Sequence, residues 1–169
     1  MTRGVRECLV YVVALSAVAA GACAPTSDVE GPDGAAQTST EAVELSVGHR
    51  SEWRELWVEG STDLPDGAHV NYRVTHELAE TAPADEWPAA NLMETGRATV
   101  QDNQFWTRIN TFRWPAGQVR ILVQFPLPPQ PPEVDARFGA LGEHLSGDNV
   151  TDLGSTKAVE VEHIFNHRR

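Results

Sequence analysis

Apolar and polar residues alternate along much of the chain after residue 42. In the segment 69–77, Val70, Tyr72 and Val74 share one side of an extended chain, and the segment 117–125 repeats this arrangement. A period of two residues is typical of a strand that buries one face. The same pattern predicts strands at 55–61, 96–101, 104–112, 133–138 and 157–164, with an eighth candidate at 43–48.

The residues between these segments favour turns. In Asp-Leu-Pro-Asp-Gly at 63–67, Pro65 fixes φ and Gly67 can adopt a positive φ, and Asp102 and Asn103 separate two predicted strands as a tight hairpin. No segment shows a sustained period of 3.6 residues, which an amphipathic helix would need. Short strands separated by turns at roughly 8–12 residues predict an all-β fold, a two-sheet sandwich of seven to eight strands.

Two predicted connections differ from simple turns. Residues 79–92 are long for a loop in a compact domain, which indicates either a functional insertion or a short helix that starts near Asp85. Residues 126–132 contain five prolines. Because proline cannot donate to a ladder of backbone hydrogen bonds, this segment is expected to be a stiff extended crossover from one sheet to the other.

The N-terminal residues have the pattern of an export signal. Arg3 and Arg6 precede an apolar run at 9–20, which is shorter than the roughly 20 apolar residues of a membrane helix. Small residues follow at 20–22 and lead to Cys23, as in the lipobox of bacterial lipoproteins, where the cysteine is acylated and becomes the new N-terminus. Residues 1–22 are therefore predicted to be a lipoprotein signal peptide.

The cysteine count favours an acylated Cys23 over plain secretion. Cys8 leaves with the signal peptide, so Cys23 would be an unpaired thiol in a secreted chain, unless a lipid is attached to it. The alternative is ordinary cleavage before the same residue. Residues 23–42 are rich in Ala, Gly, Pro, Ser and Thr and are expected to form a flexible tether, with one domain at 43–169.

The charge of the chain excludes two classes of ligand. The chain has 13 basic and 24 acidic residues. Removal of residues 1–22 takes away Arg3, Arg6 and Glu7, so 11 basic and 23 acidic residues remain, a formal net charge of −12. Such a chain repels nucleic acid and anionic lipid, so neither is expected as a partner.

Several short motifs resemble those of a known family. The family has a Gly-Thr-Thr-Asn-Leu-Pro-Asp-Gly turn, a Gln-Pro-x-x-Val segment and a Gly-x-x-Gly-Glu-x-Leu-x-Gly segment, and residues 61–67, 130–134 and 139–147 occupy these places. On these motifs the chain resembles an immunoglobulin-like domain family of uncharacterised bacterial lipoproteins and secreted proteins. The resemblance implies an immunoglobulin-like sandwich and an exported location, and it transfers no site residue.

Residue patterns that would indicate catalysis or a bound metal are weak. There is no Gly-x-Ser-x-Gly motif and no His-Glu-x-x-His motif. His163 and His167 could hold one metal on a helix, but on a strand they would lie roughly 13 Å apart. His76 ends an apolar face and is expected near water rather than as a catalytic base. The sequence therefore predicts no catalytic residues, no metal and no cofactor.

The tryptophans provide the one indication of a binding surface. Trp57 and Trp106 are out of phase with Leu56 and Phe105, so they point outward if these apolar neighbours face the core. Exposed tryptophans on a sheet suit sugar stacking or a protein partner. The alternatives are the opposite phase, or Trp57 as the core tryptophan of the sandwich. The candidate binding residues are Trp57, Trp106, Arg108, Trp114 and Trp87.

These patterns together predict a non-catalytic binding or structural module. It would be held by a lipid on Cys23 at the outer face of the cell membrane, with an envelope protein or polymer as its partner. One alternative is an envelope protein that binds a small ligand or a metal. The other is a plain secreted protein with an unknown hydrolase activity.

Overall fold

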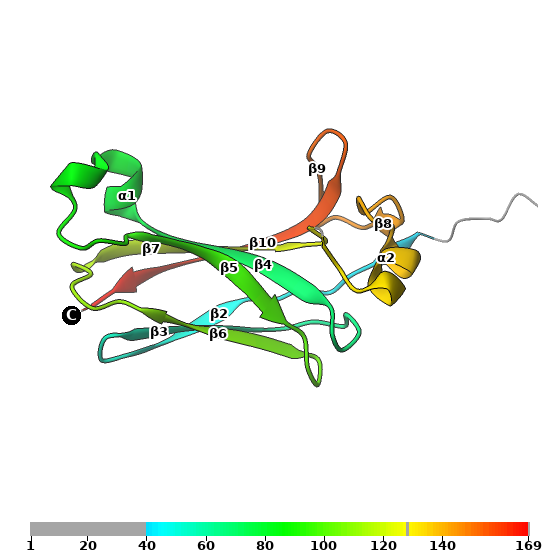
Figure 1. Cartoon of the computed structure of the whole chain (residues 1–169), viewed down its shortest axis with the longest axis horizontal. Helices are drawn as coiled ribbons and strands as arrows, with labels where there is room; N and C mark the ends of the chain where they lie inside the picture. The colour runs from blue at the N-terminus through cyan, green and yellow to red at the C-terminus, as the bar shows by residue number, and fades with distance from the viewer. Residues whose placement is uncertain (1–39, 128, 169) are drawn as a thin grey trace, which may run out of the picture. The chain divides into compact units, whose positions relative to one another are not determined.

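The computed structural model describes residues 40–127 and 129–168, all within one compact unit, Gln37–Arg169 (Figure 1). The predicted signal peptide, Cys23 and the tether up to residue 39 lie outside the described residues. Glu41 and Ala42, which the sequence analysis places at the end of the tether, form the two-residue strand β1 and belong to the folded unit.

The fold is all-β, as predicted, and has two main sheets. The three-stranded sheet has the order β2 (Gly48–Glu52), β3 (Glu55–Ser61), β6 (Gln104–Asn110). The five-stranded sheet has the order β5 (Met93–Thr99), β4 (His69–His76), β7 (Gly117–Phe125), β10 (Lys157–His167), β9 (Val150–Asp152). All neighbouring strands in these sheets are antiparallel, and β1 (Glu41–Ala42) pairs in parallel with β8 (Leu145–Ser146).

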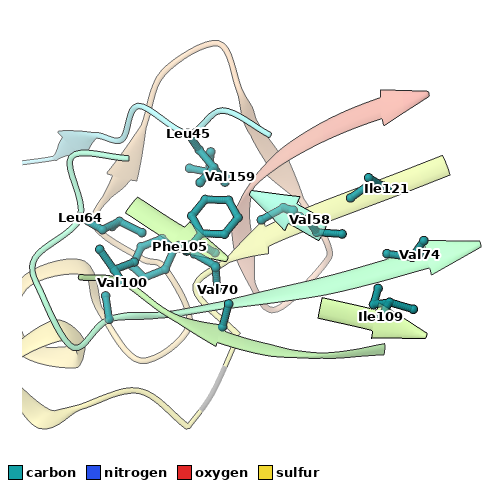
Figure 2. Close-up of a cluster of buried hydrophobic side chains, with 14 of the residues drawn as sticks. Leu45, Val58, Leu64, Val70, Val74, Val100, Phe105, Ile109, Ile121 and Val159 are labelled. Atoms are coloured by element: carbon teal, nitrogen blue, oxygen red, sulfur yellow. The ribbon is translucent and has the colours of Figure 1, made fainter. Parts of the chain in front are cut away.

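The two sheets pack face to face over one apolar core. Figure 2 shows Val58 and Phe105 from the three-stranded sheet beside Val70 and Val159 from the five-stranded sheet. All four side chains are buried, as the alternating pattern requires. Burial of a side chain of this size contributes roughly 1.5–3 kcal/mol. The core therefore fixes which face of each strand points outward.

The predicted turns adopt the expected backbone. Gly67 has φ of 89°, and Asp102 and Asn103 have φ of 52° and 60°. Two successive positive φ values are those of a type I′ turn, in which Asn and Asp are favoured beside Gly. Gln101 and Gln104 exchange backbone hydrogen bonds across it at 2.8 and 3.0 Å. The predicted tight turn is confirmed, but it makes only this isolated bridge, because the strands on either side, β5 and β6, belong to different sheets.

The predicted strand at 133–138 is wrong, because this segment is helix α2 (Pro132–Phe138). Val134 and Phe138 are buried and are four residues apart, a spacing that fits one face of a helix as well as one face of a strand. Ala136, which a strand would place on the same face, is exposed. Pro132 at the first turn and Gly139 at the C-cap with φ of 83° favour the helix.

In the eighth candidate strand at 43–48, Gly48 belongs to β2, and the residues before it make only an isolated bridge, between Leu45 and Thr62. Val43 and Leu45 are nevertheless buried, which explains the alternating pattern. On the side away from β6, the partner of β3 is β2, which was not predicted because its residues Gly-His-Arg-Ser-Glu include no apolar side chain. A polar edge strand of this kind is common in natural sheets.

The long connection after β4 contains two short helices, α1 (Glu77–Thr81) and the 3₁₀ turn η1 (Ala84–Glu86). Contrary to the expectation of a position near water, His76 is fully buried. Its Nδ1 accepts a hydrogen bond from the Leu78 amide at 3.1 Å, which caps α1, and its Nε2 lies 3.3 Å from the carbonyl oxygen of Pro115. The ring therefore has a structural role.

The proline-rich crossover does not lead to the other sheet, contrary to expectation. It carries the chain from β7 through α2, β8 and β9 to β10, which pairs with β7 in the same sheet. Gln130 fixes it to the start of β4: its Oε1 accepts from the His69 amide at 2.9 Å, and its Nε2 donates to the His69 carbonyl at 2.7 Å. Within residues 40–127 and 129–168, neither α1 nor α2 is long and apolar enough to span a bilayer.

Candidate functional site

The outer face of the three-stranded sheet carries a group of aromatic and charged side chains. The register places Trp57 of β3 directly between Arg50 of β2 and Arg108 of β6, and it places Glu59 opposite Trp106. Leu56 and Val58 are buried, so the odd-numbered residues of β3 point away from the core. We call this surface the tryptophan face; it consists of Arg50, Trp57, Glu59, Trp106 and Arg108.

The two tryptophans lie against each other and differ in exposure. Their ring centroids are 5.5 Å apart with an angle of 41° between the planes. Trp106 is 63% exposed, whereas Trp57 is half-buried. The guanidinium carbon of Arg50 lies 4.7 Å from the centroid of Trp57, and that of Arg108 lies 6.0 Å away. Cation–π contacts on both sides therefore hold Trp57, while Trp106 keeps its ring available.

Ion pairs restrain both arginines. Arg50 pairs with Glu52 on its own strand, and Arg108 pairs with Glu55 on the neighbouring strand at 3.4 Å. Exposed pairs of this kind add little stability, on the order of 0–1 kcal/mol. Their effect here is geometric, because they align the two guanidinium groups along the sides of Trp57.

A shallow hollow lies beside the tryptophans. It has a volume of about 710 Å³, and Trp106, Glu59 and Gln104 are among its lining residues. Gly48 has no side chain opposite Glu59, which leaves this part of the sheet open. Trp57 Nε1 is a buried donor without a partner among the described residues. The hollow thus combines an aromatic wall with a carboxylate and an amide.

This combination suits a ring that has an apolar face and a polar rim. The face of an indole packs against C–H groups, and carboxylate and amide groups exchange hydrogen bonds with hydroxyls. A sugar ring offers both kinds of surface. Small-ligand sites are typically apolar concave surfaces with a few polar groups that fix orientation.

The other two candidate tryptophans do not lie on this face. Trp114 is only 1% exposed, and its ring meets His76 and His167 edge-on, with centroids 5.9 and 6.1 Å away. Its position in a loop suggested exposure, but the loop folds inward over the end of the core. Trp87 is half-buried between η1 and β5, where its Nε1 donates to the Ala82 carbonyl at 2.9 Å.

Sequence reasoning missed one residue of the tryptophan face, Arg50, and one residue that lines its hollow, Gly48. Arg50 and Gly48 belong to β2, whose lack of apolar residues left its outward positions unassigned. Glu59 and Arg108 follow directly from the phase of β3 and β6, because their apolar neighbours fix which residues point outward. The sequence therefore indicated the outward residues of β3 and β6 but not those of β2.

The histidines form a contact that spacing alone did not indicate. His163 and His167 lie on one strand, as predicted, and His49 Nδ1 lies 2.8 Å from His163 Nε2 across the two sheets. Burial, and then the proximity of His163, lowers the pKa of His49. Burial, and then His76, lowers the pKa of His167. Among the described residues, no three His, Cys, Asp or Glu side chains are grouped to hold a metal ion.

Comparisons of the chain with protein-family models, curated proteins and solved structures found no match. The tryptophan face and its hollow are therefore interpreted from their own geometry.

Proposed function

We propose that this chain is an exported, lipid-anchored β-sandwich module of the bacterial cell envelope that binds a carbohydrate polymer through the tryptophan face and has no catalytic role. The export pattern, Cys23 and the tether support the location. The geometry of Trp57 and Trp106 beside the hollow supports the binding role.

We further propose that the sandwich is immunoglobulin-like. Its strand order supports this: β3 lies between β2 and β6 in one sheet, while β7 lies between β4 and β10 in the other. In an immunoglobulin sandwich, the second strand likewise pairs with the first and fifth, and the sixth pairs with the third and seventh. Here β5, the fourth of these strands, joins the sheet of β4.

One observation carries the carbohydrate assignment. Trp106 is 63% exposed at the edge of a concave surface that also contains Glu59 and Gln104. A protein partner would also bind an exposed tryptophan, but it would not need a hollow, because a flat aromatic patch with a polar rim serves a protein interface equally well. The hollow favours a ligand small enough to enter it, such as one sugar unit of a chain.

The first test is co-sedimentation of the protein with insoluble envelope polysaccharide. We expect Trp106→Ala to weaken binding at least tenfold, about 1.4 kcal/mol, because it removes the stacking surface. Gly48→Leu should have a similar effect, because its side chain would occupy part of the hollow while both tryptophans are retained.

Leu153→Ala is the matched control. Leu153 is an exposed apolar residue, 46% exposed, beyond β9 and away from the tryptophan face. The Leu153→Ala protein should bind the polysaccharide as strongly as the unmodified protein does. If polysaccharide is retained equally by all variants, or by none including the unmodified protein, the carbohydrate assignment is wrong.

The alternative of an envelope metal binder has one observation in its favour, the contact between His49 and His163. Two imidazole nitrogens 2.8 Å apart could share a metal ion instead of a proton. Metal analysis of the purified protein decides this, since a stoichiometric metal that is lost in His49→Gln would support the alternative.

A further inference from the structure

A second concave site lies at one end of the sandwich, away from the residues of the tryptophan face. The turn between β2 and β3, the loop between β6 and β7 and the end of β10 enclose a pocket of about 340 Å³. The Thr111 amide donates to the Arg54 carbonyl at 2.9 Å, which fixes the loop to the turn. We call this the end pocket; the residues used below are Trp53, Arg54, Thr111, Phe112, Arg113 and Trp114.

Arg54 is stacked between two aromatic rings in the end pocket. Its guanidinium carbon lies 3.7 Å from the centroid of Trp53 and 4.5 Å from that of Phe112. Arg113 lies over Phe112 as well, at 5.3 Å. Stacking occupies the faces of a guanidinium and leaves its N–H edge for hydrogen bonds, which is the arrangement that recognises an oxyanion with two parallel bonds.

The backbone holds both arginines in an uncommon conformation. Arg54 has φ of 68° and Arg113 has φ of 70°, the left-handed region that favours glycine. Non-glycine residues in this region concentrate at functional sites, where surrounding contacts retain the strain. Here the strain places two guanidinium groups beside one aromatic ring.

The charge of the end pocket is opposite to that of the chain. The formal net charge of the chain is −11, but Arg54, Arg113 and Arg168 all line this pocket. None of the three forms an ion pair with another described residue. Glu52, the single acid in the lining, is already paired with Arg50.

Two residues that line the end pocket have buried polar atoms without partners. Thr111 and Trp114 are 3% and 1% exposed, and Thr111 Oγ1 and Trp114 Nε1 have no partner among the described residues. Both atoms can donate a hydrogen bond. Buried donors are almost always bonded in folded proteins, so two such donors on residues of one pocket are consistent with an acceptor that a ligand supplies.

We propose that the end pocket binds an oxyanion, the carboxylate or phosphate group of a small organic ligand, between Arg54 and Arg113 and above the hydroxyl of Thr111. The pocket volume exceeds that of one water, roughly 30 Å³, by about tenfold, so it accepts the group together with an attached ring. This inference goes beyond the proposed function and uses none of the residues of the tryptophan face.

The experiment is a titration of the full-length protein followed by tryptophan fluorescence, since Trp53 is 79% exposed at the pocket. The probes are inorganic phosphate, glucose 6-phosphate and glucuronate, with uncharged glucose as the neutral analogue. We expect saturable binding of at least one anionic probe and none of glucose at the same concentration. Binding should weaken with added salt.

Four variants separate a specific site from general attraction. Arg54→Gln should weaken binding at least tenfold, and Arg54→Lys should not restore it, because lysine lacks the planar fork. Arg73→Gln makes the same charge change on the exposed face of β4 and should leave binding unchanged. Thr111→Val should weaken binding without lowering the melting temperature, because it removes a hydroxyl that has no partner.

Each outcome is decisive. If no anion binds, or if Arg54→Gln and Arg73→Gln weaken binding equally, the end pocket is not an oxyanion site. Binding of both phosphate probes without glucuronate assigns a phosphate group, and the reverse assigns a carboxylate. Trp106→Ala changes no residue of the end pocket. Loss of carbohydrate binding at the tryptophan face is therefore distinguishable from loss of oxyanion binding at the end pocket.

Discussion

Two glycines next to each other in space show how differently single positions of this sheet tolerate change. A Cβ added at Gly60 would collide with the carbonyl oxygen of Ser46 and with the ring of Phe105. A Cβ added at Gly48 would meet only the Glu59 carbonyl oxygen, at 3.9 Å. Gly60 is thus required by packing against the core, whereas Gly48 leaves the hollow open.

We predict that Gly60→Ala destabilises the fold by about 1–3 kcal/mol, because Phe105 or the segment around Ser46 must move. Gly48→Ala should change stability by less than about 0.5 kcal/mol. Urea denaturation of both variants measures the difference. If their midpoints are the same, the close approach at Gly60 does not constrain the fold.

The positions of individual tryptophans could be predicted only where a strand pattern surrounds them. Trp57 and Trp106 were expected to point outward if Leu56 and Phe105 faced the core, and both of these neighbours are buried. Trp114 has no such pattern, because it lies in the loop after β6. Its burial depends on His76 and His167, which come from distant parts of the chain.

At the scale of elements, prediction followed apolar alternation and failed where alternation was absent or ambiguous. β7 has four buried residues in alternation and was placed with its correct bounds. β2 has no apolar alternation, because a polar edge strand is held by hydrogen bonds to its partner β3 rather than by burial of its own side chains. In α2, Val134 and Phe138 fit both periods, so only Pro132 and Gly139 could have distinguished them.

One contact joins the two main sheets and should depend on pH. His49 of β2 and His163 of β10 share a hydrogen bond that needs one N–H and one lone pair. His167 and Glu59 also act on His49, and Phe165 stacks on it with centroids 3.5 Å apart. The pKa of His49 is lowered in the folded state, so the unfolded chain binds protons more readily.

We therefore predict that stability is highest above the ordinary histidine pKa and falls as the pH drops through it. Between about pH 7.5 and about pH 5.5 the melting temperature should fall by roughly 2 °C, a small change because solvent screens this partly exposed pair. His167, whose pKa is also lowered, contributes in the same direction.

Melting curves of His49→Gln test this prediction. The variant should lose part of the pH dependence, because its side chain does not titrate. Ser51→Ala alters the same strand without removing a titrating ring and should keep the full dependence. Equal pH slopes for all three proteins would show that the contact between His49 and His163 does not couple protonation to folding.

At the scale of the molecule, an acidic chain concentrates arginine along one side. Arg50 and Arg108 flank Trp57, Arg54 and Arg113 line the end pocket, and a shallow hollow lined by both Arg54 and Arg108 lies between the two sites. The end pocket could not be predicted from the sequence, since it joins the turn after β2, the loop after β6 and the end of β10, whereas the residues that β3 and β6 contribute to the tryptophan face could be. A polymer with anionic groups would meet both.

The same charge leads to a prediction about membrane attachment. With a formal net charge of −12 after removal of residues 1–22, the chain is repelled by anionic lipid, so attraction between charges does not hold it at a membrane. A lipid on Cys23 would hold it, and stable attachment needs more than one acyl chain. The predicted tether of about 20 residues would then give the domain a reach of roughly 25 Å from that surface.

We predict a diacyl or triacyl adduct on Cys23 in the N-terminal peptide from native membranes, measured by mass spectrometry. Cys23→Ala should move the protein to the aqueous fraction. Its melting temperature should not change, because every residue of the described core lies after residue 42. An unmodified Cys23 peptide in the medium would contradict the anchor, and so would a Cys23→Ala protein that stays with the membrane. Either result would leave the tryptophan face and the end pocket as sites of a freely diffusing protein, whose ligands need not lie within reach of the membrane.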